Sequence, residues 1–125
     1  MDPRHWKRIN IVQQIYSSLF DIPQANNKNT FLKNTNEILK NKEKLSNIIK
    51  KYAQKFPVEN LAKVDLSILY LAIYELLFEK KTPPKVIINE AVQIAKELGG
   101  ERSYAFVNGV LGKVYINEIE KKRKI

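Results

Sequence analysis

The sequence predicts an all-α fold, on three observations. Apolar residues recur at the helical spacings of three and four along most of the 125-residue chain. Only 4 glycines and 5 prolines occur, which suits helices joined by short connections better than a β architecture with many turns. Hydrophobic residues make up 44% of the chain, which is enough for one continuous core or two small adjoining ones. One folding unit of packed helices is therefore expected.

The first helix is expected to begin at Asp2 and Pro3, because aspartate is a common helix cap and proline a common first residue. Its apolar stripe comprises Ile9, Val12, Tyr16 and Leu19. The helix should end before Pro23. The asparagine-rich segment 23–30 is predicted to be a loop, since asparagine amides compete with the helical backbone for hydrogen bonds.

Two shorter helices should follow, a weaker one over 31–39 and a stronger one over 42–55, which Pro57 closes. Apolar residues then cover most of the circumference of a helix over 58–79, as is typical of a helix buried on nearly all sides. We expect that helix to be the centre of the fold. Residues 1–56 are expected to form an N-terminal helical sub-bundle.

The rest of the chain is predicted to hold two more helices. One begins near Pro84 and stops at Gly99, since glycine is common just beyond the end of a helix. The last helix opens near 101–103. Together with the central helix these two would form a C-terminal sub-bundle over about 57–120, followed by a frayed and solvated basic tail, 121–125.

The charge of the chain favours a polyanionic partner. Lysine and arginine total 22 against 13 acidic residues, and the resulting net charge of +9 is large for so small a domain. The absence of cysteine excludes disulfides, thiolate metal sites and a cysteine nucleophile. The start of the chain lacks the apolar core of a signal peptide, and no apolar run reaches membrane-spanning length. Nucleic acid is the expected partner, and the cytoplasm the expected location.

No group of residues in the sequence assembles a catalytic site. His5 has no second histidine and no thiolate with which to hold a metal. Glu75 lies on the most apolar helix, where a carboxylate more often pairs with a base than acts as a general acid. The glycine pairs within 99–100 and 109–112 lack the preceding strand of a phosphate-binding loop, and are expected to provide a helix stop and close helix packing. We therefore predict no enzymatic activity, no cofactor and no metal.

Six stretches match the motifs of one known family in order and spacing. They are Arg4–Arg8, Val12–Tyr16, Ala72–Leu76, Pro84–Ala91, Gly99–Glu101 and Phe106–Leu111. These stretches resemble the basic opening, the "VQALY" segment, and the "A-x-YEL", "P-x-KV-x-INEA" and "FVNGVLD" elements of the NusB transcription antitermination family. Residues 23–57 resemble the family only in helical character.

The resemblance implies a domain of two small packed helical bundles that binds the boxA segment of single-stranded RNA together with the small-subunit ribosomal protein NusE. In the family, that pair joins RNA polymerase antitermination complexes, notably on ribosomal RNA operons. Carried over residue by residue, the RNA surface comprises Arg4, His5, Lys7, Arg8, Arg102, Tyr104 and Phe106. Cationic side chains there would contact phosphates and aromatic rings would stack on bases, although Phe106 could equally be a core residue.

The resemblance also implies a surface for NusE. On this chain it maps to Tyr16 and to Asp65, which opens the central helix. An exposed carboxylate at Asp65 facing a basic partner would add steering and register more than affinity.

Two departures from the family pattern bear on RNA binding. Many relatives carry an acidic residue where this chain has Arg102, so RNA should bind more tightly or less selectively here. His5 and Trp6 also stand where the family opening is usually richer in arginine. Trp6 could stack on a base or pack against the bundle, and packing is the favoured interpretation.

Two alternatives compete with the antitermination hypothesis. The chain could be a homodimer whose RNA face is buried between subunits, and the sequence does not decide between monomer and dimer. It could also be a NusB-like domain related to ribosomal RNA methyltransferases, although 125 residues leave no room for a catalytic α/β domain. RNA binding by the chain alone is expected to be weak and sensitive to salt.

Overall fold

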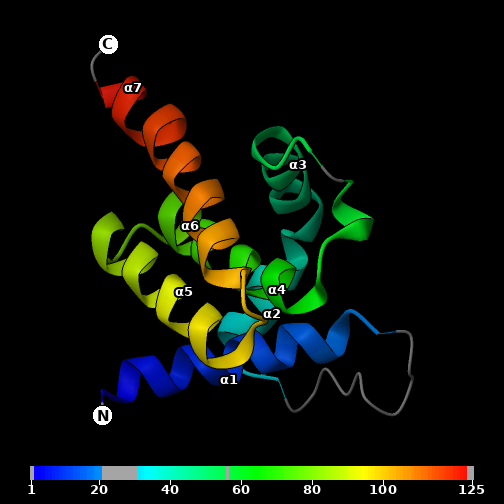
Figure 1. Ribbon diagram of the computed structural model, residues 1–125. Coiled ribbons are helices and arrows are strands. Elements are labelled where there is room, and N and C mark those ends of the chain that lie inside the picture. The colour runs from blue at the N-terminus through cyan, green and yellow to red at the C-terminus, as the bar shows by residue number, and fades with distance from the viewer. Residues whose placement is uncertain (1, 21–30, 56, 124–125) are drawn as a thin grey trace.

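A computed structural model describes residues 2–20, 31–55 and 57–123 of the chain (Figure 1). All regular structure within these ranges is helical, which confirms the all-α fold. The main helices are α1 (Pro3–Ser18), α2 (Lys33–Lys40), α3 (Lys42–Tyr52), α4 (Lys63–Ile73), α5 (Pro84–Leu98) and α6 (Ser103–Val114). The shorter elements are the 3₁₀ helix η3 (Val58–Asn60), the π-helical turns η4 (Tyr74–Glu79) and η5 (Tyr115–Glu120), and the last turn α7 (Lys121–Arg123).

Helix α4 lies at the centre of the fold, as the sequence predicts. It contacts α1, α3, α5 and α6, and every residue from Asp65 to Ile73 is buried. Helices α1, α2 and α3 form one group around it, while α5 and α6 form a second (Figure 1). This arrangement confirms the two packed helical bundles. Because α4 contacts both groups, a border between sub-bundles near residue 56 stays a prediction.

The central helix begins later than predicted. The expected start near 58 is wrong because Leu61 and Ala62 are extended, with ψ angles of 146° and 132°. Only the short η3 precedes them. At its other end the helix runs on from α4 into η4, where Lys80 closes it in the left-handed conformation with φ 57°.

The ends of the other helices differ by a few residues. Helix α1 ends at Ser18 and α3 at Tyr52, short of the prolines that were expected to stop them. The basic tail, expected to be frayed, is helical and exposed as far as Arg123, because it continues α6 through η5. The predicted asparagine-rich loop over 23–30 lies outside the described residues.

Side-chain hydrogen bonds position the first two helices. Asp2 caps α1 as predicted, since its carboxylate accepts a hydrogen bond of 2.9 Å from the backbone N–H of Arg4. Gln14 then joins α2 to α1. Its amide oxygen accepts from the backbone N–H of Leu32 at 2.9 Å and from the hydroxyl of Thr35 at 2.6 Å.

The turn between α5 and α6 depends on Gly99. A Cβ at this position would lie 2.5 Å from the Ser103 side chain and 2.7 Å from the carbonyl oxygen of Ala95. Ser103 itself is held in place, because its hydroxyl accepts a hydrogen bond of 3.0 Å from the N–H of Gly100. The predicted helix stop is confirmed. The predicted close packing at the second glycine pair is wrong, since a Cβ at Gly109 or Gly112 would meet no atom of the described residues within 4 Å.

This contrast predicts opposite effects for two alanine substitutions. Gly99→Ala should lower the free energy of unfolding by about 1–3 kcal/mol, because Ser103 and the backbone would have to move. Gly109→Ala should raise it by up to about 1 kcal/mol, because alanine favours a helix interior and the space is open. Urea denaturation monitored by circular dichroism would measure both. Equal effects of the two changes would contradict this account of the turn.

A carboxylate ties the C-terminal helix to α3. Glu118 accepts hydrogen bonds from the hydroxyl of Tyr52, from Lys51 at 3.3 Å and from Lys122 at 3.1 Å. The bond from Tyr52 contributes most to lowering the pKa of Glu118 to about 2, from an ordinary value of 4.5. The two bundles are therefore joined by a charged contact as well as by the apolar core.

The lowered pKa predicts a component of acid sensitivity. The stabilisation from Glu118 should be complete above pH 4.5 and lost as the pH falls toward about 2, because the folded state releases the proton more readily than the unfolded chain. Glu118→Gln should therefore be less stable than the wild type at pH 6, with a smaller further loss between pH 4.5 and 2. Glu120→Gln, at an exposed position of the same segment, is the matched control. Identical acid profiles for both variants in urea denaturation would refute the assignment.

Candidate functional site

A buried ion pair joins α1 to the centre of the fold. Nε and Nη2 of Arg8 donate to the two carboxylate oxygens of Glu75 at 3.0 and 2.9 Å, and both residues are buried. A weaker bond of 3.3 Å runs from Nη1 of Arg8 to Glu90 on α5. The hydrogen bonds that Arg8 donates to Glu75 raise the pKa of Arg8, which therefore stays charged. The prediction that Glu75 pairs with a base is confirmed.

His5 lies in the same interface, only 6% exposed. Its Nδ1 is 3.0 Å from a carboxylate oxygen of Glu90, and its Nε2 is 2.9 Å from a carboxylate oxygen of Glu97. Contact of His5 and Arg8 with RNA stays a prediction. Such contact would require RNA to break the bonds that hold both side chains against carboxylates of the protein itself.

Other side chains at the start of α1 are open to solvent. Arg4 and Lys7 are exposed, as their predicted role requires. Trp6 is 51% exposed, and its ring meets His5 only edge-on, with ring centroids 6.2 Å apart. The favoured interpretation that Trp6 packs against the bundle is therefore wrong. The first turns of α1 combine two cationic side chains with an open aromatic face.

A second exposed group lies at the start of α6. Arg102 is exposed directly before the helix, and Tyr104 is 44% exposed. The ammonium group of Lys96 on α5 stands 5.4 Å from the centroid of the Tyr104 ring, a cation–π distance. Phe106 is partly buried and packs against the core, so it is a weaker candidate for base stacking.

Helix α5 brings these two groups together. Its residue Glu97 bonds to His5 of α1, and its neighbour Lys96 contacts Tyr104 of α6. The starts of α1 and α6 therefore lie on adjacent sides of the last turns of α5. Among the predicted RNA-binding side chains, this brings His5 toward Tyr104, whereas Arg4 and Lys7 line a hollow with Lys81 and Thr82 just before α5.

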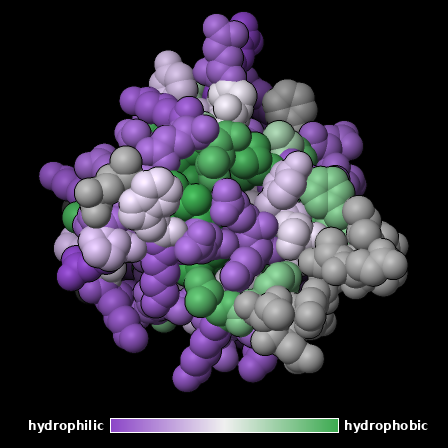
Figure 2. Space-filling model, turned by 90° about the horizontal axis from the view of Figure 1, so that it is seen from below, coloured by the Kyte–Doolittle hydropathy of each residue, from purple (hydrophilic) through white to green (hydrophobic). Residues whose placement is uncertain are grey.

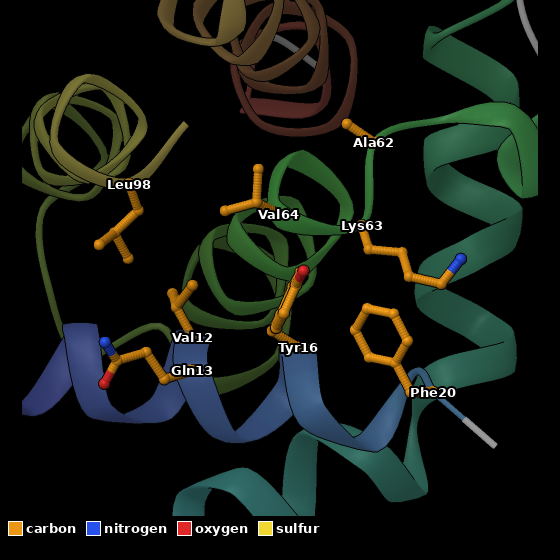
Figure 3. A pocket seen from close by; sticks show the side chains of 8 residues that line it. All are labelled: Val12, Gln13, Tyr16, Phe20, Ala62, Lys63, Val64 and Leu98. Carbon is orange, nitrogen blue, oxygen red and sulfur yellow. The ribbon is translucent and has the colours of Figure 1, made fainter. Parts of the chain in front are cut away.

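An apolar pocket of about 580 Å³ lies beside α1 (Figure 3). Its lining comes from α1 and the segment after it, from the start of α4 and from the end of α5, and comprises Val12, Gln13, Tyr16, Phe20, Ala62, Lys63, Val64 and Leu98. The Tyr16 ring meets Phe20 edge-on with centroids 4.9 Å apart, and Lys63 stands 5.5 Å from the Phe20 centroid. Figure 2, which views the molecule from the side of α1, shows apolar side chains gathered near the centre of a mostly hydrophilic face.

The two predicted NusE-binding residues occupy different environments. Tyr16 is 40% exposed and lines the pocket. Asp65 is 8% exposed, so the exposed carboxylate on which the steering argument depends is not present in this structure. Its Oδ1 is buried and has no hydrogen-bond partner among the described residues, an arrangement that costs free energy. Asp65 follows directly after pocket residues Lys63 and Val64, which places it beside the same surface.

The described ranges contain no group of three or more metal-ligating side chains placed to hold a metal ion. None of their helices is both long and apolar enough to span a membrane.

The fold and its exposed features define a class of protein, an all-helical domain with two bundles around one buried helix and two neighbouring surfaces suited to binding. The chain belongs to the NusB family, which matches it over residues 7–115. A transcription antitermination protein NusB of Clostridium botulinum is 51% identical over 77 residues, which are 62% of this chain. The match spans 55% of that relative, about half of its length.

Solved structures share the whole fold. T. maritima NusB is 31% identical, with a TM-score of 0.76 and 99% of both chains covered. A chain in the crystal structure of antitermination factors NusB and NusE in complex with double-stranded RNA is 20% identical, with a TM-score of 0.68, covering 92% of this chain and 98% of that one. The second likeness concerns the fold alone.

Sequence reasoning missed three contributors to these surfaces. Lys96 beside Tyr104 gave no motif signal, because the pair forms only when the turn at Gly99 folds α6 back on α5. Phe20 and Leu98 line one pocket although 78 positions separate them in the chain. Tyr16, which the sequence pattern places in the apolar stripe of α1 but which is 40% exposed, is the residue that could have pointed to the pocket.

The buried ion pair predicts a large cost for removing one partner. Glu75→Ala should lower the free energy of unfolding by about 3–5 kcal/mol, because Arg8 would remain buried without its main counter-charge. The double variant Arg8→Met/Glu75→Leu should recover most of that loss, since no buried charge is left. Glu43→Ala, at an exposed site on α3, should change stability by less than about 0.5 kcal/mol. Urea denaturation of all four proteins would measure these differences, and a double variant no more stable than Glu75→Ala would argue against a coupled pair.

Proposed function

We propose that this chain is an RNA-binding transcription antitermination factor that binds boxA-type single-stranded RNA together with NusE. The observation that carries the proposal is the meeting of α1 and α6 on the last turns of α5. There the exposed cation Arg102 stands two positions before the exposed ring of Tyr104, and the exposed cations Arg4 and Lys7 stand on α1 close in sequence to His5. Cations that contact phosphates, beside rings on which bases stack, are the combination that single-stranded RNA requires.

Membership of the NusB family supports the same role. The curated relative described above is named as a transcription antitermination protein, and the matched region 7–115 includes Lys7, Arg102 and Tyr104. The proposed action is that of a binding platform for RNA and protein, without catalysis. A place in RNA polymerase complexes on ribosomal RNA operons belongs to this proposal.

The pocket beside α1 is the proposed site for NusE. Its apolar lining and the exposed ring of Tyr16 suit an apolar side chain of a protein partner. Oδ1 of Asp65, close by in the chain and without a hydrogen-bond partner among the described residues, would accept a hydrogen bond from a donor that the partner brings.

Fluorescence anisotropy with a labelled boxA-like RNA tests the proposal. The wild type should bind boxA-like RNA more tightly than a scrambled RNA, more so with NusE present, and less tightly at higher salt. Tyr104→Ala should weaken binding about tenfold, because one base would lose its stacking partner. Lys7→Ala should reduce the slope of log K against log salt by about 0.7, the value for one phosphate contact on a single strand.

Matched variants make the test specific. Lys113→Ala removes the same charge from an exposed position about 14 Å further along α6 than Tyr104, and should leave boxA affinity nearly unchanged. Tyr16→Ala should abolish the enhancement of RNA binding by NusE. The affinity for RNA measured without NusE should stay unchanged. Equal binding to boxA-like and scrambled RNA, unaffected by NusE, would refute the proposal. Light scattering with and without RNA would detect a homodimer whose RNA face is buried.

A further inference from the structure

His5 has an arrangement that requires a charged ring. Each of its two nitrogens lies within 3.0 Å of a carboxylate oxygen, on Glu90 and on Glu97. A carboxylate accepts hydrogen bonds and does not donate them, so both ring nitrogens must carry a hydrogen for both bonds to form. The geometry is therefore that of the imidazolium form.

The charges around His5 balance only when it is protonated. We define the His5 cluster as His5, Arg8, Glu75, Glu90 and Glu97. It draws two cations from α1, one carboxylate from η4 and two carboxylates from α5. With neutral His5, three carboxylates would face one guanidinium across an interface in which Glu75 is buried, Glu90 is partly buried and Glu97 is exposed.

The contacts of the cluster concentrate on Glu90, which bridges both cations. One of its oxygens bonds to Arg8 at 3.3 Å and the other to His5 at 3.0 Å. Glu97 is steadied in turn by Gln93, one helical turn earlier on α5, whose amide donates to it at 3.2 Å. Arg8 is fixed independently by Glu75, so the position of the turn before Arg8 depends on the bonds of His5.

We propose that His5, Glu90 and Glu97 are positioning residues, whose proton-dependent bonds hold the first turns of α1 on α5 and so keep Arg4, Trp6 and Lys7 in place for RNA. Loss of the His5 proton removes one of its two bonds and turns a ring lone pair toward a carboxylate. The turn then loosens and RNA affinity falls. This inference rests on the proposed function.

The direction of the pH dependence follows from the cluster. The hydrogen bond from His5 to Glu97 raises the pKa of His5 above 6.5, with a smaller contribution from Glu90, while burial acts the other way. The same bond lowers the pKa of Glu97. A raised histidine pKa means that the stabilisation is complete below pH 6.5 and is lost as the pH rises through the higher value of the folded state. RNA affinity should therefore decrease from neutral to mildly alkaline pH.

His5 is the only histidine of the chain, so its ring protons can be followed by NMR without ambiguity. The experiment titrates the full chain from pH 5.5 to 9 by NMR and measures anisotropy of boxA-like RNA over the same range. We expect a His5 midpoint above 6.5 and a loss of affinity of about fivefold, centred on that midpoint. Glu97→Gln should move both midpoints together to lower pH, because the amide lacks the charge that stabilises the imidazolium.

Two controls separate positioning from other effects. At every pH, His5→Gln should bind RNA about as weakly as the wild type does at high pH. Any pH dependence of RNA affinity that remains in this variant reports the α-amino group, which titrates near pH 8. Glu101→Gln removes an equal charge from the exposed turn before α6, and should leave the His5 midpoint and the shape of the affinity profile unchanged.

The outcomes distinguish this inference from the proposed function. If the wild type binds boxA-like RNA with the same affinity on both sides of the His5 midpoint, the positioning role is refuted and the RNA-binding function stands. If Glu97→Gln moves the NMR midpoint but not the affinity profile, the positioning role is likewise refuted. If boxA-like RNA is bound no better than scrambled RNA at any pH, both the inference and the proposed function fail.

Discussion

Removing the guanidinium of Arg8 and the carboxylate of Glu75 from water is costly, so each group must satisfy the other closely for the fold to be stable. The two-point contact between them meets that requirement, and it fixes the rotation of α1 about its own axis. That rotation determines what the rest of α1 does. It turns Val12 and Ile15 into the core and leaves Arg4 and Lys7 in solvent. The exposed surface of the helix is thus set by a contact on its hidden side.

Much of the fold could be predicted from the sequence because it depends on periodicity and on local rules. The buried central helix followed from apolar residues around its whole circumference, and the start of α1 followed from Asp2 and Pro3. The sequence predicts that the central helix begins near position 58, because helical spacing does not register the extended backbone at Leu61 and Ala62. Those two residues change the direction of the chain without interrupting its apolar pattern.

The candidate site was predicted less completely, for a physical reason that concerns α1. His5 and Arg8 are cationic or ionisable, and a basic helix suggested a single RNA-facing group. Their spacing from Val12 and Ile15 nevertheless places all four on one side of the helix, which is the buried side. Burial of such residues depends on carboxylates supplied by distant segments, so it becomes visible only once the chain is folded. The pocket beside α1 was out of reach for the same reason.

The helix that starts at Ser103 continues without a break to Arg123, and only its first part is enclosed by other helices. Val107, Leu111 and Val114 are buried, whereas beyond the bonds of Glu118 every described residue of α7 is exposed. Local opening of such a helix becomes easier step by step from its packed end to its free end. Amide hydrogens along it will therefore exchange with solvent water in a graded order, slowest near Leu111 and fastest in the final turn. The C-terminal turns thus form a segment that can melt and refold on its own while the two bundles stay intact.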